Sequence, residues 1–582
     1  MNTPHSIARR NVQRNAIETT VHRIGQMRVT AHRAGLRLVG AGGLIAGAWP
    51  AAAQAADGGY GAWSLLPPVL AIVLALTLRQ VIPALFLGLW AGTWILAGSG
   101  PAAPFAGLFA TFQVYVLKAL ANPDHAAVIL FSMMIGGMVG ILGRNGGMAG
   151  IVQAISRWIA DARGAAAATA ALGLAIFFDD YANSLVVGNT MRPLTDHLGL
   201  SRAKLAYIVD STAAPVACIA LVTTWVGYEV GLVQDAIAPL AGLDTSPYLI
   251  YISSIAYSFY PLLAIAMVFM IALSGRDFGP MYDAEKRAAQ GNPGIPVTQC
   301  PGDDLYDGGK QSSAWNAVLP ILLLLSTVIA GLWLSGSAAL NGKEASLRNV
   351  IGAADAYQAL LWGSLAGVVG AVTLSFVNRL LNLEQIVNAW FTGVRTMLMA
   401  MIILVLAWAL SDITRELGTA DYLVSVLPAA LGPQWMPAIV FILAALTAFA
   451  TGSSWGTMGI LLPLVVPLVW SLLGRHDMAA EPSLHLLHAA VAAVLTGAVW
   501  GDHCSPISDT TILSSMASGC DHIEHVRTQL PYALTVGAIS VLFGALPVGF
   551  GVPWYWALAL SFGILWLTVR LLGKKSGPAA GG

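Results

Sequence analysis

Residues 501–511 concentrate polar side chains in a very apolar part of the chain, directly after an uncharged run at 490–500. Pro506 lacks a backbone N–H and clashes with the preceding turn, so we expect a helix to break here, with Gly501 contributing to the break. A broken helix rich in oxygen ligands at membrane depth is typical of an ion site in a transporter. The stretch combines two carboxylates, one imidazole and four hydroxyls, from Asp502, Asp509, His503, Ser505, Ser508, Thr510 and Thr511.

Composition places these residues in a membrane. The chain has 582 residues, of which 57% are hydrophobic and only 10% are charged, and its mean hydropathy is +0.72. Soluble domains carry about 25% charged residues, so this is an integral membrane protein. The formal net charge is zero, which gives no argument for a nucleic-acid partner. The four cysteines lack the spacing of zinc ligands, and no metal site or cofactor is predicted.

The N-terminal 56 residues form a basic extension that ends in a signal-peptide-like segment. A short apolar run at 38–49 follows many arginines and precedes an alanine-rich stretch at 51–56. This order is typical of a secretory signal peptide, and cleavage near Ala55 would place the mature N-terminus outside. The basic region is long, so Met27 could be the true start. The alternative is a disordered cytoplasmic tail followed by a weak first helix.

The remaining chain divides into two apolar halves. We expect a first transmembrane repeat at 57–274, a polar cytoplasmic loop at 275–313, a second repeat at 314–572 and a flexible tail at 573–582. Lys and Arg in the loop and the tail favour the cytoplasmic side for both. We predict roughly twelve membrane segments. Several are shorter than the about 20 residues that a full span needs, which indicates half-helices or hairpin arms.

The two halves repeat an order of features. A polar loop ends an apolar run at 179–184 and again at 451–457, and a proline follows each loop. Residues 210–215 in the first half then correspond to residues 501–506 in the second. Duplicated halves whose helices are interrupted at matching positions predict a binding site at the interface between the repeats.

Four polar segments, 179–190, 210–215, 451–457 and 501–511, are expected to converge on this site. Oxygen atoms are the ligands that hard cations prefer, and a buried carboxylate can hold either a proton or a cation. Asp502 and Asp509 are the preferred carriers. The other candidate ligands are Asp179, Asp180, Asn183, Asn189, Asp210, Ser211, Thr212, Ser453, Ser454, Thr457, Ser505, Ser508, Thr510 and Thr511; the expected helix breaks are at Pro215, Pro506, Gly452 and Gly501.

Structural roles compete with these assignments in the first half. Asp179 or Asp180 could cap the helix that follows, because Asp is a favoured N-cap residue. Asp210 could pair with Arg192 or Lys204.

The second half leaves similar alternatives open. Asp502 and Asp509 could both be solvated at an interface. His503 could relay protons, but a hydrogen-bonded structural role is the better interpretation.

Residues 177–184, 188–193, 210–215 and 501–511 resemble the NhaC-type Na⁺/H⁺ antiporter family, and the likeness covers most of 64–570. The resemblance implies an all-α polytopic membrane protein with two inverted repeats, broken helices and re-entrant hairpins. It implies Na⁺ and H⁺ as transported ions in the bacterial inner membrane, or an organic acid such as malate exchanged for lactate. A homodimer is compatible with it. His503 and Cys504 depart from the family's pattern, which has a lysine and an apolar residue there.

The function expected from the sequence is therefore secondary antiport of Na⁺ against H⁺ by alternating access. An organic-anion exchanger is the alternative, with Arg192 or helix N-termini near Ser453 holding a carboxylate. An intramembrane hydrolase is a distant alternative, because the chain has no HExxH motif; a channel is a fourth. If the segments converge, Asp180 and Asp210 lie within about 10 Å of Asp502.

Overall fold

The computed structural model describes residues 60–575, except residues 79, 157–158, 160, 239, 241, 244, 293, 295–312, 341–349, 352, 427–431 and 479–482. The expected signal peptide, its cleavage site and the alternative start at Met27 lie outside the described residues. So do most of the polar loop after residue 294 and residues 576–582 of the tail.

The first half of the described chain is built from helices and one very short strand. In chain order these are η1 (Gly61–Leu65), α2 (Leu66–Leu78), α3 (Val81–Ala97), α4 (Ala103–Ala110), η2 (Thr111–Val116), α5 (Leu117–Ala121), α6 (Pro123–Arg144), α7 (Gly147–Ser156), α8 (Ala162–Ala175), α9 (Asp180–His197), α10 (Arg202–Thr212), α11 (Ala214–Ala217), α12 (Thr224–Ile237), α13 (Pro247–Ile255), α14 (Phe259–Ser274), β1 (Arg276–Asp277) and α15 (Pro280–Ala289).

The second half continues in the same style. Its elements are α16 (Trp315–Leu340), α18 (Ala356–Val377), α19 (Leu383–Glu416), α20 (Thr419–Val426), η3 (Pro433–Trp435), α21 (Met436–Thr451), α22 (Ser454–Arg475), α23 (Leu484–Cys504), α24 (Asp509–Ala517), α25 (His522–Ile539), η5 (Ser540–Ala545), α26 (Leu546–Gly549), α27 (Trp554–Leu572) and β2 (Lys574–Lys575). β1 and β2 pair antiparallel.

The helices are those of a multi-pass membrane protein. Among the described residues, ten helices are long and apolar enough to cross a membrane. An eleventh span results if α13 and α14, bent by 41° at their junction, are counted together. The all-α polytopic fold is thus confirmed, while the two-repeat organisation and the count of twelve stay predictions. Large apolar side chains such as Ile329, Trp556 and Leu571 are exposed, as expected for surfaces that face lipid.

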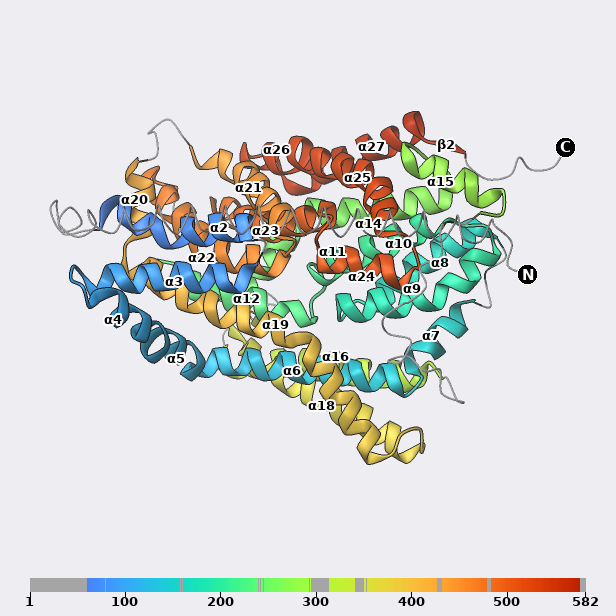
Figure 1. Ribbon diagram of the computed structural model, residues 1–582, viewed down its shortest axis with the longest axis horizontal. Coiled ribbons are helices and arrows are strands. Elements are labelled where there is room, and N and C mark those ends of the chain that lie inside the picture. The colour runs from blue at the N-terminus through green and yellow to red at the C-terminus, as the bar shows by residue number, and fades with distance from the viewer. Residues whose placement is uncertain are drawn as a thin grey trace, which may run out of the picture.

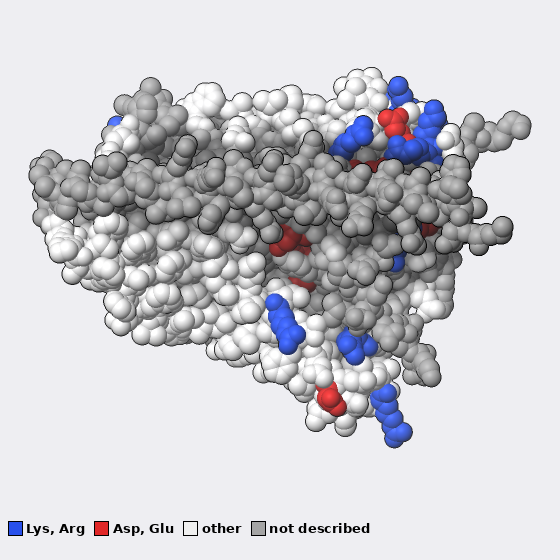
Figure 2. Space-filling model, viewed as in Figure 1, with Lys and Arg blue, Asp and Glu red and all other residues white. Residues whose placement is uncertain are grey.

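Charged side chains are sparse on the face shown in Figure 2, and the densest group lies at one corner of it. Figure 2 shows Lys, Arg, Asp and Glu concentrated at the upper right of the face it presents, over the region of α15 and β2. The amphipathic helix α15 lies within the stretch expected to be a polar loop, and it begins with Pro280 at a favourable helix-start position. The polar stretch is therefore partly helical and packs against α10 and α25.

Two short helices lie inside the bundle. α11 and α24 follow interruptions of α10 and α23, and both lie toward the middle of the long axis of the molecule (Figure 1). α24 packs against α9 and α10, and α11 contacts α9 and α23. The fold thus brings segments from the two halves together at the interruptions.

Candidate functional site

Two interrupted helices frame the candidate site. α10 ends at Thr212, where Ala213 adopts φ −88° and ψ −92° and stops the helix. Pro215 then lies in the first turn of α11. α23 ends at Cys504, and α24 begins at Asp509 after a non-helical connection that contains Pro506. The expected break at Pro506 is confirmed, and Pro215 directly follows the other break.

The two glycines expected to break helices behave differently. The prediction for Gly501 is wrong, because it lies inside α23, where a Cβ would come 2.1 Å from the carbonyl oxygen of Ala445 on α21. Its function is close helix packing. Gly452 does end α21, with φ +68°. A Cβ there would lie 2.6 Å from the carbonyl oxygen of Ile507, so this turn touches the connection between α23 and α24.

Adjacent threonines of α24 bind carboxylates from two other helices. The Thr510 hydroxyl donates a 2.7 Å hydrogen bond to Asp502. The Thr511 hydroxyl donates a 3.1 Å hydrogen bond to Asp210. Both aspartates are buried. Segments 210–215 and 501–511 therefore meet, as expected from the sequence.

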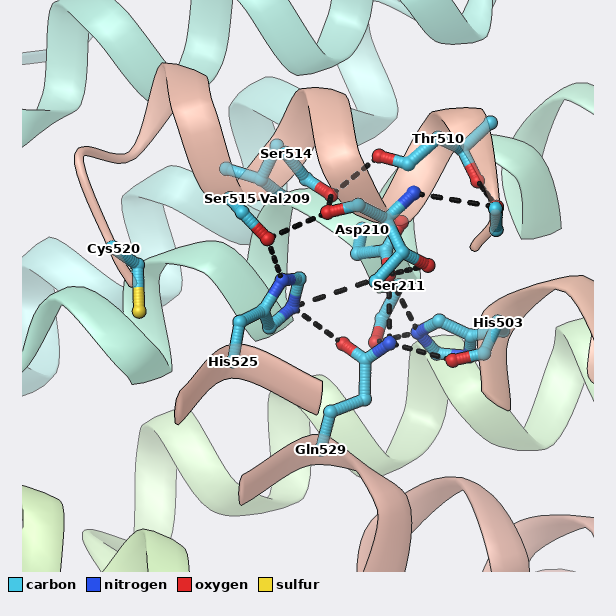
Figure 3. Close-up of polar contacts among 12 residues, drawn as sticks. Val209, Asp210, Ser211, His503, Thr510, Ser514, Ser515, Cys520, His525 and Gln529 are labelled. Atoms are coloured by element: carbon cyan, nitrogen blue, oxygen red, sulfur yellow. Dashed lines mark hydrogen bonds and ion pairs between the residues drawn. The ribbon is translucent and has the colours of Figure 1, made fainter. Parts of the chain in front are cut away.

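Asp210 is surrounded by polar groups from α23 and α25 (Figure 3). The Gln529 amide donates a 2.7 Å hydrogen bond to Asp210 and a 2.6 Å hydrogen bond to the carbonyl oxygen of His503. The Nε2 atoms of His503 and His525 lie 3.7 and 4.0 Å from the same carboxylate. Lys204, one of its two expected partners, is instead paired with Asp277 and Glu285.

His503 is held at both ring nitrogens. Its Nε2 lies 3.1 Å from the Ser211 hydroxyl, and its Nδ1 lies 2.5 Å from the Tyr260 hydroxyl. This agrees with the interpretation of His503 as a hydrogen-bonded residue. It also accounts for Ser211, whose hydroxyl contacts the imidazole.

The segment 179–190, at the start of α9, also contacts the site at α24. Asp179 caps α9 by accepting a 2.7 Å hydrogen bond from the backbone of Ala182, which confirms the capping interpretation for one of the two aspartates. Both carboxylate oxygens of Asp180 are buried and have no hydrogen-bond partner among the described residues. Tyr181 donates a hydrogen bond to Asp509, which joins the start of α9 to the start of α24.

Two asparagines of α9 are placed differently. Asn183 donates to the carbonyl oxygens of Gly173 and Thr212, at 2.7 and 2.9 Å, and so ties α9 to the break after α10. The Thr212 hydroxyl bonds back into its own helix. The amide atoms of Asn189 and the hydroxyl of Ser184 are buried without a hydrogen-bond partner in the described part of the chain.

The segment 451–457 contributes mainly backbone contacts. The Ser453 side chain caps α22, and the Thr457 hydroxyl donates a 3.0 Å hydrogen bond to the Ser453 carbonyl. Ser454 is buried beside them. The Ser505 hydroxyl donates a 2.7 Å hydrogen bond to the carbonyl oxygen of Phe449 at the end of α21. The segment 451–457 therefore lies next to the α23–α24 connection. It thus forms a wall of the site while its hydroxyls serve its own helix.

Sequence reasoning missed several polar residues of this region. Gln529 and His525 are spaced four residues apart on α25, and this spacing places them on one helix face. Glu229 is the single charged residue in the apolar run 226–233. A charged residue in an apolar transmembrane helix indicates a function, and this pattern could have identified Glu229 from the sequence. Tyr181, next to the two aspartates, carried no signal of its own.

A bundle of apolar helices whose polar interruptions meet in its interior is the architecture of a membrane transporter. The chain belongs to the Na⁺/H⁺ antiporter family, which matches residues 216–548, more than half of its length. An uncharacterized protein of Haemophilus influenzae is 33% identical over 87% of this chain and 95% of its own. The malate-2H⁺/Na⁺-lactate antiporter of Bacillus subtilis is 29% identical over 29% of this chain and 33% of its own.

The fold itself has a solved counterpart. The YdaH transporter of Alcanivorax borkumensis superposes with a TM-score of 0.55 and 17% sequence identity, over 84% of this chain and 99% of that one. Family membership and fold together support a secondary transporter rather than an enzyme. The resemblance noted in the sequence is thereby confirmed.

Proposed function

We propose that this protein exchanges Na⁺ for H⁺ across the bacterial inner membrane by alternating access. The observation that carries the proposal is the meeting of Asp210 and Asp502 at adjacent threonines of α24. It places two buried carboxylates from separate halves of the chain at one short helix, next to both helix breaks.

Buried carboxylates in such an arrangement need positive charge. Asp180 and Asp509 join the group through Tyr181, which follows Asp180 and bonds Asp509. Neighbouring carboxylates in a low-dielectric interior cannot all remain ionised without a bound cation or protons. Hard oxygen ligands suit Na⁺, and the same oxygens accept protons. Exchange of cations and protons at buried carboxylates is the physical basis of antiport.

The breaks supply the means of movement. α24 has nine residues and its cap residue Ser508 follows a non-helical connection, so it can shift relative to α10 without unfolding a long helix. Its contacts with Asp210 and Asp502 are side-chain hydrogen bonds, which can be exchanged for contacts with a cation. Alternating exposure of these carboxylates to the two sides would complete the exchange.

Transport in proteoliposomes tests the proposal. Purified protein is reconstituted with a pH-sensitive dye inside, and Na⁺, Li⁺ or K⁺ is added outside. We expect Na⁺ to drive proton movement, with no response in Asp502→Asn. Absence of any cation-dependent proton movement in correctly inserted wild-type protein would reject the proposal.

Exchange of organic anions is the second candidate. It is favoured by the similarity to the malate-2H⁺/Na⁺-lactate antiporter. The N-terminus of α22 at Ser453 and Ser454 offers backbone donors and a positive helix dipole to a carboxylate. Adding malate or lactate to the same proteoliposomes separates the candidates: counterflow of labelled malate or lactate would favour the exchanger, and cation-driven proton movement without either acid would favour the Na⁺/H⁺ antiporter.

A further inference from the structure

Glu229 is a buried carboxylate that the proposed cation site does not use. It lies in α12 and is 0% exposed. Neither of its carboxylate oxygens has a hydrogen-bond partner, and it forms no ion pair, within the described ranges of the chain. An ionisable residue inside a membrane bundle is expensive to keep and points to a function.

The polar groups around Glu229 are few and weak. The Cys218 thiol and the Tyr251 hydroxyl face the carboxylate. Tyr251 directs its hydroxyl to the carbonyl oxygens of Ala220 and Cys218, at 3.0 and 3.4 Å. These carbonyls belong to residues 218–223, which form no regular helix between α11 and α12.

Within the described part of the chain, the helices packed against α12 give Glu229 no ion-pair partner. α6 carries His125, but that imidazole pairs with Asp235 at 3.0 Å, six residues further along α12. On α12 itself, Tyr228 donates its hydroxyl to the carbonyl oxygen of Trp455 on α22. On α19, Arg415 pairs with Asp412 of the same helix.

Glu229 is close to the cation site but separate from it. The first residues of α12, Thr224 and Trp225, lie beside Asp179 and Asp180. Glu229 follows Trp225 by four residues, about 6 Å along the helix and on a similar face. The carboxylate therefore sits about one helical turn beyond the group that includes Asp180.

The surroundings of Glu229 suit a proton better than a cation. A hard cation requires a shell of several oxygen ligands, whereas here a thiol and one engaged hydroxyl are the neighbouring side-chain groups. An unpaired buried carboxylate is stable in the neutral form. We propose that Glu229 is a proton-binding site of the transport cycle, separate from the cation-binding carboxylates around Asp502. This inference rests on the proposed antiport.

Two readouts on the same proteoliposomes test it. The first is Na⁺-driven proton movement, and the second is exchange of labelled Na⁺ for Na⁺ at equal pH on both sides. Glu229→Gln is expected to lose the proton movement and keep the Na⁺ exchange, because the oxygen ligands of the cation site are intact. Asp502→Asn is expected to lose both. Asp235→Asn is the matched control, since its carboxylate lies on the same helix but is paired, and it should retain both.

The outcomes separate this inference from the proposed function. Wild-type protein without Na⁺-driven proton movement would reject the antiport itself. Glu229→Gln with an unchanged proton-to-Na⁺ ratio would overturn the inference alone, and so would loss of both readouts in correctly inserted Glu229→Gln. If Glu229→Gln fails to insert, Glu229→Asp decides: a pH profile of proton movement that differs from wild type supports the site, and an identical profile overturns it.

Discussion

The hydroxyl of Thr511 donates a 3.1 Å hydrogen bond to the carboxylate of Asp210, although 301 positions separate the two residues. The bond connects the first turn of α24 with the last turn of α10, so the interruption in one half of the chain is held directly against the interruption in the other. Any displacement of α24 relative to α10 must break this contact. It is therefore a sensitive place to test the proposed site.

Replacing Thr511 by Val removes the donor and keeps the shape of the side chain. A hydrogen bond to a charged group contributes about 1.5–3 kcal/mol. We expect the apparent Na⁺ affinity of transport to change by about tenfold or more, with the protein still inserted. Thr535→Val is the control, because that hydroxyl bonds the carbonyl of Pro531 in its own helix. An unchanged Na⁺ dependence in Thr511→Val would place Asp210 outside the cation site.

Asp502→Asn and Asp509→Asn each remove a charge with little change of volume. We expect each variant to abolish Na⁺-dependent proton movement while membrane insertion is preserved, because both carboxylates belong to the group gathered at α24. Dye-based assays in everted vesicles measure this directly. Asp196→Asn is the control, since Asp196 forms a partly exposed ion pair with Arg202. Normal transport in either Asp502→Asn or Asp509→Asn would move the site elsewhere.

Much of this arrangement could be predicted from the sequence, for identifiable physical reasons. Proline lacks the backbone N–H that a helix needs and clashes with the preceding turn, so the break at Pro506 followed from residue type alone. Polar side chains in an apolar chain need polar partners within the protein. The meeting of Asp210 with residues 501–511 was therefore predictable. Asp179 as an N-cap followed from local geometry in the same way.

The remaining contacts depend on packing that no local pattern records. Lys204 is paired with Asp277 and Glu285, which lie 73 and 81 positions away, whereas the sequence suggested Asp210 as a possible partner. Gly501 was predicted to break a helix, but glycine is required there because α21 packs closely against α23. Gln529 reaches Asp210 from a helix whose orientation is set by the whole bundle.

Gly501→Ala tests that packing role. The new Cβ would come 2.1 Å from the carbonyl oxygen of Ala445, so α21 and α23 would have to separate. Overpacking of this kind costs about 1–3 kcal/mol, and we expect a lower midpoint of thermal unfolding in detergent. Gly474→Ala is the matched control in α22, where a Cβ would meet nothing within 4 Å. Equal stability of the two variants would contradict the close approach of the helices.

Lys204→Met tests the ion-pair network between α10, β1 and α15. Lys204 is buried and lies 2.9 Å from Asp277 and 3.4 Å from Glu285. Removing the ammonium leaves two buried carboxylates without a cation, which costs about 3–5 kcal/mol. Lys118→Met is the control, because Lys118 is largely exposed in its pair with Asp412, and exposed pairs contribute about 0–1 kcal/mol.

The stability lost in Lys204→Met should depend on pH. Burial raises the pKa of Glu285, and the nearby Lys204 ammonium opposes that rise. Without Lys204 the carboxyl binds its proton at a higher pH, so the loss of stability should be largest at alkaline pH and shrink as the pH falls. Thermal unfolding across a pH series measures this. The variant Lys204→Met/Asp277→Asn/Glu285→Gln should lose the pH dependence and recover stability; a penalty that grows toward acidic pH would refute the network.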